Sequence, residues 1–346
     1  MRILTAILCL LFLFSSCEEP KGSSPRTTFF SGNAMTIDYK IIVGDPLSPS
    51  QFAEVNDLIA ATFSEVNTVY NNWNPESEVS RLNQLPSHTV VSLSPQLIRL
   101  LKSTQEIVEL TEGLFDPTVE PIHALWKNKM QEGEIPSDEE IAAIAPFIGW
   151  KNIHLNGNKF FKDHDETRMD FGGIAKGLCV DLLVENLNKA EYKNIYVEWG
   201  GEIRATGMHP ENRPWNIFIS NLGDPDPKHA IDHLNISDHA IASSGDYWQY
   251  WVIPGSEDSD IYTHIVNPLT LRALKASPSS VASTNVLTRD CTLADGLATA
   301  AMLFSSVEEA REWSERIQKK IPETQFWFIS RLNNTDLIPV SKESSQ

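Results

Sequence analysis

The first third of the chain carries apolar residues at the spacing of amphipathic helices. Between residues 51 and 70 they recur every three or four positions, which gives a helix one apolar face: Phe52, Val55, Leu58, Ile59, Phe63 and Val66. A second helix is expected from Ser94 to Gly113, because serine caps a helix, the proline that follows suits its first turn, and glycine ends it. Ser137 and Glu140 have the spacing of a capping box and predict a third, shorter helix.

Runs rich in β-branched and aromatic residues predict strands, most of them in the middle of the chain. The first is 36–43, and the others are 152–155, 159–162, 195–199, 215–220, 239–243, 262–266 and 325–330. Further helices are expected at 174–189, 292–304 and 307–319. Because strands and helices mix without regular alternation, the pattern favours an α+β fold over a doubly wound parallel sheet. No repeat or linker divides residues 31–335, so we expect one domain there and a polar tail at 336–346.

The N-terminus is typical of an exported protein. In residues 1–16 an early arginine precedes an apolar run that ends at Phe14, which is shorter than the roughly 20 residues of a membrane-spanning helix. Two serines directly precede Cys17, so this segment resembles a bacterial lipobox and implies cleavage before Cys17 and acylation of that residue. An ordinary signal peptide with an incidental cysteine is the alternative. Residues 17–30 would then be a flexible tether to the bacterial cell membrane, on its periplasmic or exterior side.

Composition and charge argue against some classes of protein. The chain has 346 residues with 46 acidic and 28 basic side chains, a net charge of −18. That balance argues against binding to nucleic acid, which depends on clustered Lys and Arg. Nine Trp, fifteen Phe and seven Tyr exclude a disordered chain, because so much apolar area favours a packed core. A phosphate-bearing substrate would meet unfavourable charge here, so we expect a divalent cation to accompany one.

Two cysteines remain beyond the N-terminal segment, Cys179 and Cys291. Export would permit a disulfide between them. Both lie in apolar, helix-like stretches, which favours two buried thiols. Whether they pair is left open by the sequence.

Residues 169–177 (MDFGGIAKG) place Asp170 and two glycines just before a predicted helix that carries Lys176 in its first turns. Glycines allow close approach of the backbone to a ligand, and a helix N-terminus suits an anion. Lys176 would reach a phosphate or a ribose. A tight strand-to-helix turn with a solvated lysine is the alternative.

Residues 293–302 (LADGLATAAM) place Asp295 and Thr299 four positions apart, on one face of a predicted apolar helix. A carboxylate is costly to bury without a partner, and a hard cation would compensate its charge. Carboxylate and hydroxyl oxygens suit Mg²⁺, which also binds phosphate oxygens and water. In the alternative interpretation, Asp295 caps the start of the helix.

Three further segments complete the candidate site. His264 lies in a predicted strand and would act as a general acid or base near a metal, although a structural, hydrogen-bonded histidine is the usual alternative. The other histidines lack the spacing of a zinc site. The segments 71–83 and 113–121 set Trp73 and Phe115-Asp116 in loops that suit a flat ring with polar edges, and such residues are equally usual in cores and turns.

Taken together and in this order, these segments resemble the ApbE-type family of FAD:protein FMN transferases. The matching segments begin with Met35 and its neighbours and continue with WNPESEVSRLN, GLFDPTVEPIHALW, MDFGGIAKGLCVD, VEWGGEIRATG, AIASSGDYWQYW, THIVNP and ADGLATA. They cover nearly the whole chain after the signal segment. Members of the family are typically exported, often as lipoproteins, in agreement with the independent interpretation of Cys17.

The resemblance implies an α+β fold, related to the T-fold, in which FAD lies in a cleft with Mg²⁺ at its pyrophosphate. By motif position it assigns the FAD site to Met35, Trp73, Leu114, Phe115, Asp116, Asp170, Lys176, Ile265 and Ala298. It assigns the metal to the side chains of Asp295 and Thr299 and to the carbonyl oxygen of Gly173. His264 corresponds to the family histidine that assists catalysis.

The implied reaction cleaves FAD between its phosphates, joins FMN through a phosphoester to a Ser or Thr hydroxyl of another protein, and releases AMP. Family acceptors carry Asp-x-x-(Ser/Thr)-Gly-Ala-(Ser/Thr) in flavoprotein subunits of membrane electron-transfer complexes. This chain lacks that signature, so we do not expect it to flavinylate itself. Two alternatives are an FAD pyrophosphohydrolase that gives FMN and AMP, and a non-catalytic flavin-binding lipoprotein.

The chain departs from the family after His264. The usual Asp-Pro-x-Thr-Gly is here Asn267-Pro268-Leu269-Thr270-Leu271, so the local turn and a second metal contact stay open. The aromatic residue at the Trp73 position is often tyrosine in the family. Tryptophan still stacks on a ring but changes the polar edge.

Overall fold

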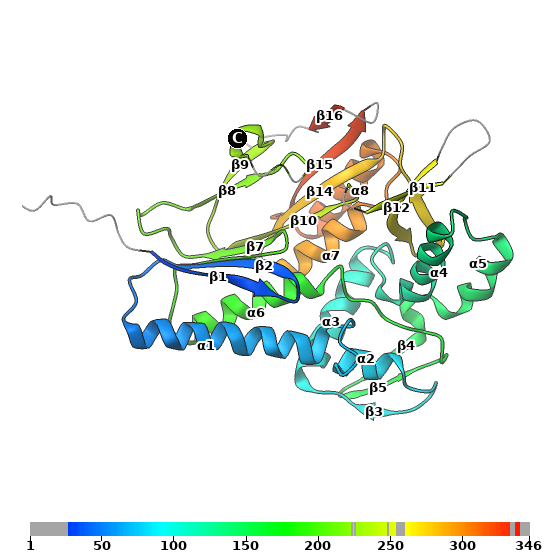
Figure 1. Cartoon of the computed structure of the whole chain (residues 1–346), viewed down its shortest axis with the longest axis horizontal. Coiled ribbons are helices and arrows are strands. Elements are labelled where there is room, and N and C mark those ends of the chain that lie inside the picture. Colours follow the sequence, from blue (N-terminus) through cyan, green and yellow to red (C-terminus); the bar gives the residue numbers. More distant parts are fainter. Residues whose placement is uncertain are drawn as a thin grey trace, which may run out of the picture.

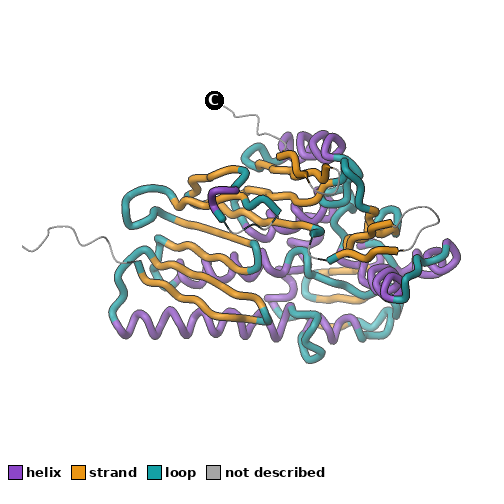
Figure 2. The backbone as a smooth tube through the Cα atoms, turned by 45° about the horizontal axis from the view of Figure 1, so that its top comes forward, coloured by secondary structure: helices purple, strands orange, loops and turns teal. Residues whose placement is uncertain are grey.

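An eight-stranded antiparallel sheet lies at the centre of the computed structural model, which describes residues 27–222, 224, 226–247, 249–253, 260–332 and 336–339. Its strand order is β1-β2-β6-β7-β10-β14-β15-β16, and every neighbouring pair is antiparallel. The strands, drawn side by side in Figure 2, are β1 (Thr28–Ala34), β2 (Ile37–Val43), β6 (Ile195–Trp199), β7 (Glu202–Thr206), β10 (His239–Gly245), β14 (Val281–Thr288), β15 (Gln325–Leu332) and β16 (Asp336–Pro339).

Helices cover one face of this sheet (Figure 1). Helix α6 (Ala175–Lys189) packs on β6 and β7, and α7 (Cys291–Ala301) packs on β10 and β14. Around them lie α1 (Pro49–Glu65) against α6, α3 (Pro95–Leu110) against α7, and α8 (Val307–Lys320) against β15. Most residues of α6 and α7 are buried, because these two helices lie between the sheet and the outer helices. The largest apolar core of the protein fills this layer.

A hairpin of β8 (Trp215–Ile219) and β9 (Asp232–Ile236) packs on the sheet through a second core. Its alternating apolar residues, Trp215, Ile217 and Ile219, contact sheet residues such as Tyr196 and Trp327. Because strand residues alternate between faces, this core lies opposite the helical layer. The sheet is therefore apolar on both faces.

A third core joins the three-stranded sheet of β11 (Tyr250–Ile253), β12 (Asp260–Asn267) and β13 (Arg272–Lys275) to α4 (Glu120–Gln131) and α5 (Asp138–Ile144). The remaining elements are β3 (Val91–Ser92), β4 (Ile153–Asn156), β5 (Lys159–Lys162) and α2 (Glu78–Asn83). One π-helical turn, Val66–Tyr70, and four short 3₁₀ turns, Pro117–Val119, Ala145–Phe147, Trp150–Asn152 and Pro227–His229, complete the described chain.

The α+β class is confirmed, and so are the predicted helix caps. Ser94 Oγ accepts a hydrogen bond from the Leu97 backbone at 3.1 Å, and Ser137 and Glu140 form both halves of their capping box. The helices and strands expected from the sequence are present, with ends that differ by a few residues.

Several elements were not predicted. They are the strands β1, β3, β7, β9, β11, β13, β14 and β16 and the helices α2 and α4. Strand β1 begins at Thr28, inside the segment expected to be a tether, and β16 pairs with β15 inside the expected polar tail. The ends of the domain therefore extend further than the sequence indicated. The signal segment, Cys17 and most of the tether lie outside the described residues.

Cys179 and Cys291 are buried free thiols, so the structure contains no disulfide between them. Burial raises the pKa of both thiols well above the ordinary value. In the described part of the chain, no helix combines the length and apolar character needed to cross a bilayer.

Candidate functional site

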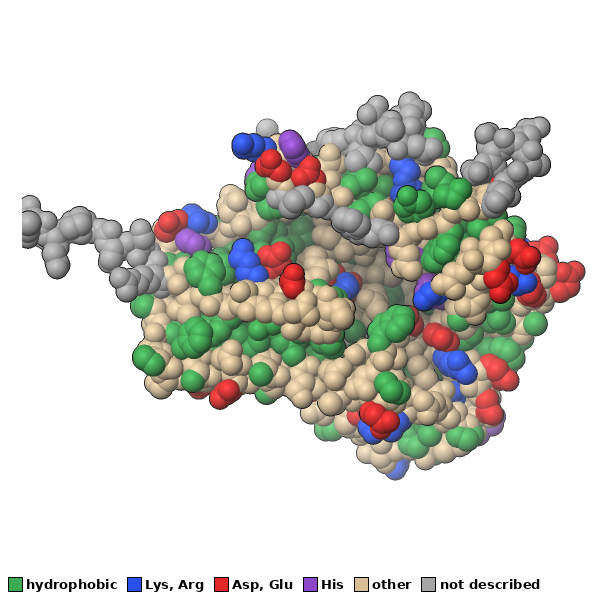
Figure 3. Space-filling model, viewed as in Figure 1, with side chains coloured by type: hydrophobic (Ala, Val, Ile, Leu, Met, Phe, Trp, Pro, Cys, Tyr) green, Lys and Arg blue, Asp and Glu red, His purple; other side chains and the backbone are tan. Residues whose placement is uncertain are grey.

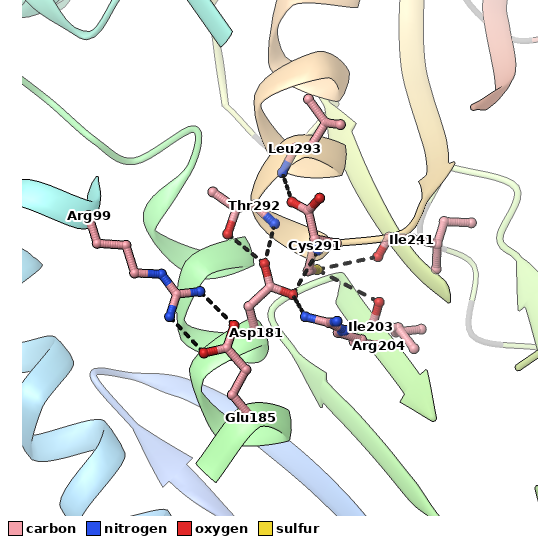
Figure 4. A network of polar contacts seen from close by, with 10 residues as sticks. Arg99, Asp181, Glu185, Ile203, Arg204, Ile241, Cys291, Thr292 and Leu293 are labelled. Atoms are coloured by element: carbon pink, nitrogen blue, oxygen red, sulfur yellow. Dashed lines mark hydrogen bonds and ion pairs between the residues drawn. The ribbon is translucent and has the colours of Figure 1, made fainter. Parts of the chain in front are cut away.

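The site begins with the contact between α6 and α7. Gly177 of α6 lies so close to α7 that a Cβ on it would be 2.2 Å from the carbonyl oxygen of Cys291. Asp181, one turn further along α6, accepts hydrogen bonds from the backbone N–H groups of Cys291 at 2.9 Å and Thr292 at 2.8 Å (Figure 4). It also pairs with Arg204 of β7 at 2.5 Å. Asp181 thus satisfies free N–H groups at the start of α7 and fixes the two helices in register.

The residues predicted to bind a metal lie together along this contact. Asp295 of α7 is 1% exposed, and its Oδ2 accepts a hydrogen bond from the Gly177 backbone N–H at 2.9 Å. One turn later, Thr299 Oγ1 lies 3.3 Å from the carbonyl oxygen of Gly173, to which it donates. The backbone before α6 and one face of α7 therefore bring a carboxylate, a hydroxyl and a carbonyl oxygen together.

Glu202 was not predicted as a site residue, although its segment, VEWGGEIRATG, is one of those that resemble the family. It follows two glycines at the start of β7, is completely buried, and accepts a hydrogen bond from Lys176 at 2.5 Å. Asp295 Oδ1 lies 3.6 Å from the same ammonium. Burial opposes the charged form of Lys176, but Asp295 and Glu202 outweigh it and raise the pKa of the ammonium. Lys176 is therefore charged and paired, not a solvated lysine.

The charge of these three side chains depends on the protonation of Glu202. Among the described residues, Glu202 Oε2 has no hydrogen-bond partner. Burial, with a contribution from Asp295, raises the pKa of Glu202 to about 8 and also raises the pKa of Asp295. With Glu202 protonated, Asp295 and Lys176 balance each other, and an added cation would favour the charged form of both carboxylates.

The donor set fits a hard divalent cation. Neighbouring ligands of an octahedral Mg²⁺ lie roughly 3 Å apart, close to the 3.3 Å between Thr299 Oγ1 and the Gly173 carbonyl oxygen. Among the residues that the structure describes, no three His, Cys, Asp or Glu side chains converge as metal ligands. A cation here would therefore combine Asp295 with hydroxyl, carbonyl, water or substrate oxygens, which is the pattern that Mg²⁺ prefers.

The residues assigned to FAD differ in exposure. Trp73 is 77% exposed, and Lys127 Nζ of α4 lies 5.8 Å from the centre of its ring. Met35, Leu114 and Ile265 are partly buried against the main core. Phe115 and Ala298 lie inside that core. Figure 3 shows a hollow in the middle of one face of the molecule.

The two aspartates assigned to FAD are held by the backbone. Asp116 caps the turn that follows it, and its other oxygen accepts from the Trp150 N–H at 2.8 Å. Burial raises the pKa of Asp116 despite these bonds. Asp170 accepts from the Gly172 N–H at 2.8 Å, and its own N–H donates to the carbonyl of Pro117. Asp116 therefore organises its own loop, and Asp170 joins that loop to the glycine turn.

His264 lies on β12, in the separate three-stranded sheet. Its Nδ1 lies 3.2 Å from the carbonyl oxygen of Gln249, and burial, with a contribution from His123, lowers the pKa of its imidazole. A carbonyl oxygen only accepts, so Nδ1 carries the hydrogen and Nε2 has a free lone pair. His264 has the protonation state of a base at neutral pH.

His123 of α4 is a second histidine that sequence reasoning missed. Its pKa is lowered by burial, while Asp170 opposes this effect, and it forms a hydrogen bond with the backbone of His264. It thus contacts the strand of His264 and interacts electrostatically with Asp170. Its motif, GLFDPTVEPIHALW, was noted, but helix α4 was not predicted, so no pattern pointed this side chain towards the site.

The turn after His264 forms even though residues 267–271 depart from the usual family sequence. Asn267 Oδ1 accepts from the backbone N–H groups of Leu269 at 2.8 Å and Thr270 at 3.2 Å, as an aspartate would. Leu271, which replaces the usual glycine, adopts a positive φ of 58°. The turn is therefore kept, at the expense of some backbone strain.

A second strained turn holds Met35. Ala34 pairs with Ile37, so Met35 and Thr36 form a two-residue hairpin loop with φ values of 48° and 68°. Such loops normally use glycine or asparagine, because side chains crowd the backbone at positive φ. Strained residues of this kind concentrate at functional sites.

Thr36→Gly is expected to stabilise the protein by about 1 kcal/mol. A left-handed conformation costs a non-glycine residue roughly 1–2 kcal/mol, and the greater freedom of glycine in the unfolded chain offsets part of the gain. Urea unfolding of both proteins measures the difference. Thr36→Ala, which keeps the Cβ, is the control and should show no such gain. A glycine variant less stable than the wild type would contradict strain at this turn.

Comparison with known proteins places this geometry in a family. The sequence model of the ApbE family matches residues 35–323. A protein of Chlamydia pneumoniae named FAD:protein FMN transferase is 36% identical over 312 residues, which cover 90% of this chain and 95% of that protein. One of the same name from Vibrio cholerae is 32% identical, with 88% of each chain covered.

Solved structures of ApbE proteins share the fold of this chain. The flavin transferase ApbE from Vibrio cholerae superposes with a TM-score of 0.73 at 28% identity, covering 92% of this chain and 98% of that one. The apo form of a flavinyl transferase ApbE from Pseudomonas stutzeri shares the fold, with a TM-score of 0.78 at 24% identity and coverage of 92% and 95%. By sequence, by fold and by the residues gathered between α6 and α7, this chain belongs to the ApbE family.

Proposed function

We propose that this chain transfers the FMN part of FAD to a Ser or Thr hydroxyl of an acceptor protein, with Mg²⁺ as the metal, and releases AMP. The observation that carries the proposal is the buried group of oxygens from Asp295, Thr299 and Gly173 beside Lys176. Membership of a family whose curated relatives are named FAD:protein FMN transferase supports the same activity.

The residues of the chain account for binding and charge balance. Lys176, which is fixed by Glu202, would contact an anionic part of FAD. Asp295, Thr299 and Gly173 would hold Mg²⁺, which when bound supplies charge neutralisation at the pyrophosphate. Nε2 of His264 takes the proton from the acceptor hydroxyl, and this makes the oxygen a better nucleophile towards the FMN phosphorus. The bond to the AMP phosphate then breaks.

The alternatives differ in their products. Incubation of the domain from residue 26 onward with FAD, Mg²⁺ and an acceptor domain that carries the Ser/Thr signature separates them. Covalent flavin fluorescence on the acceptor is the expected result. Free FMN and AMP without labelled acceptor would support hydrolysis, and unchanged FAD would support a storage protein.

His264→Ala is expected to leave FAD affinity within about twofold and to slow transfer about a hundredfold or more, which is the usual contribution of a general base. In the wild type, the rate should stay constant through neutral pH and fall only on the acidic side of the ordinary histidine value of 6.5, because burial lowers the pKa of this imidazole. The variant should lack this acidic limb. Equal losses of FAD binding and rate would instead indicate a structural histidine.

We also propose that the protein is a lipid-anchored, exported enzyme. The order of signal segment, two serines and Cys17 supports this, and β1 begins only eleven positions after Cys17, at Thr28. A tether of that length extends at most about 40 Å, so the enzyme would act close to the membrane, on subunits of membrane electron-transfer complexes. Mass spectrometry of the mature N-terminal peptide tests the acylation, and an unmodified Cys17 would rule it out.

A further inference from the structure

Strand β11 is an open edge beside the strand of His264. Among the described residues, it pairs on one side only, with β12 in the order β11-β12-β13. The His264 N–H donates to the Gln249 carbonyl at 3.2 Å, and Tyr250 is the next residue in register, opposite Thr263. Hydrogen-bonded and non-hydrogen-bonded pairs alternate along an antiparallel ladder. Tyr250 and Val252 therefore direct their backbone N–H and C=O groups away from β12, towards the open side.

The side chains of this edge are apolar and exposed. Tyr250 is 55% exposed and Val252 is 53% exposed, whereas Trp251 and Ile253 belong to the core under α4. Natural edge strands are usually protected from pairing by charges, by proline or by a covering element. Within its described residues, β11 (YWVI) has no charge and no proline.

The opposite edge of the same sheet is protected. Strand β13 carries Arg272, which pairs with Asp138, and Lys275, whose Nζ lies 2.7 Å from Asp260. Two edges of one small sheet therefore differ: one has paired cations, and the other has bare backbone and apolar side chains. This difference favours a binding role for β11.

Other exposed apolar side chains belong to segments of the candidate site. Leu269, in the turn after His264, is 60% exposed, and Trp73 is 77% exposed. A protein that brings a hydroxyl group to His264 must come close to β11, because His264 lies on the neighbouring strand β12.

We infer that β11 is the docking strand for the acceptor protein. An extended segment of the acceptor adds to its open edge, bonds to the backbone of Tyr250 and Val252, and places alternate apolar side chains on theirs. Neighbouring strands lie about 4.8 Å apart, so the added strand is roughly 10 Å from β12. The hydroxyl residue therefore belongs to the turn next to that strand. This inference rests on the proposed transfer function and identifies how its protein substrate is recognised.

Val252→Pro tests the backbone contact. Proline removes the outward N–H of residue 252 and no bond to β12, and edge strands tolerate proline there. The probe is a purified acceptor domain carrying Asp-x-x-(Ser/Thr)-Gly-Ala-(Ser/Thr), and its covalent flavin fluorescence is followed at increasing acceptor concentration. We expect the KM for the acceptor to rise about tenfold, the effect of one good hydrogen bond, with the Kd for FAD unchanged.

Val252→Thr keeps the N–H and a similar shape, so its acceptor KM should stay within about twofold of the wild type. Val252→Lys, which copies the protected edge of β13, should raise the KM and provides a second test if the proline variant is unstable. Wild-type acceptor KM in both the proline and the lysine variants would overturn the inference. Absence of covalent flavin with the wild-type enzyme would overturn the transfer function itself and the inference with it.

Discussion

Asp295→Ala is expected to reduce transfer at least about a hundredfold at ordinary Mg²⁺ concentrations, because it removes the one carboxylate of the oxygen group beside Thr299 and Gly173. The fold should survive. Lys176 remains paired with Glu202, so its ammonium keeps a buried carboxyl partner. Covalent flavin on the acceptor and the Mg²⁺ dependence of its formation measure the effect.

Thr299→Ser is the matched control for this experiment. It keeps the hydroxyl oxygen one turn from Asp295 and should retain most of the activity, whereas Thr299→Val should lose much of it. Thermal unfolding of each variant verifies the fold. Undiminished transfer by Asp295→Ala at ordinary Mg²⁺ would remove the metal assignment, and with it the role of Thr299.

Gly177→Ala is expected to destabilise the protein by about 3 kcal/mol or more, near the upper end for overpacking of a core. The added Cβ would lie 2.2 Å from the backbone carbonyl of Cys291 and 2.9 Å from the Cβ of Asp295. Backbone atoms at the start of α7 cannot yield without shifting the helix. On helix propensity alone, alanine would be more stable than glycine by about 1 kcal/mol, so even the sign of the effect is informative.

Gly296→Ala provides the comparison. This glycine lies in α7, and its Cβ would meet the side chain of Ile107 at 2.9 Å, which is able to rotate or shift. Its cost should be clearly smaller. Urea unfolding of the two variants and the wild type measures both values. A Gly177→Ala protein as stable as the wild type would show that the α6–α7 contact is looser than the structure indicates.

The helices of the site were predictable because their signals are local. Asp295 and Thr299 are four positions apart, so any helix places them on one face, and the structure does so. Ser94 and Ser137 act through residues three positions away. In each case the physical cause lies within a single helical turn.

Strand β14 was missed because its environment, and not its composition, decides its structure. Its sequence, VASTNVLT, is half polar, yet all eight residues are buried. Two of the polar members find partners in the neighbouring strand: Ser243 Oγ donates to Asn285 Oδ1 at 2.6 Å, and Ser283 Oγ donates to the Ser244 carbonyl at 3.0 Å. No periodicity within the segment indicates such partners.

Glu202 and His123 were missed for a related reason. Glu202 becomes part of the site only through Lys176, which is 26 positions earlier and on another element. His123 depends on a helix that begins without a side-chain cap, because Val119 precedes Glu120 and Pro121. Both residues lie in segments that resemble the family. Their roles depend on contacts between elements that are far apart in the sequence, which no local pattern indicates.

The buried thiols of Cys179 and Cys291 make the junction of α6 and α7 directly observable. In the domain that begins after Cys17 they are the two cysteines of the sequence, one on each helix. Fully buried and held as neutral thiols, they are inert to alkylating reagents while the helices stay together. The rate at which iodoacetamide modifies them therefore reports how often this junction opens, without any introduced label.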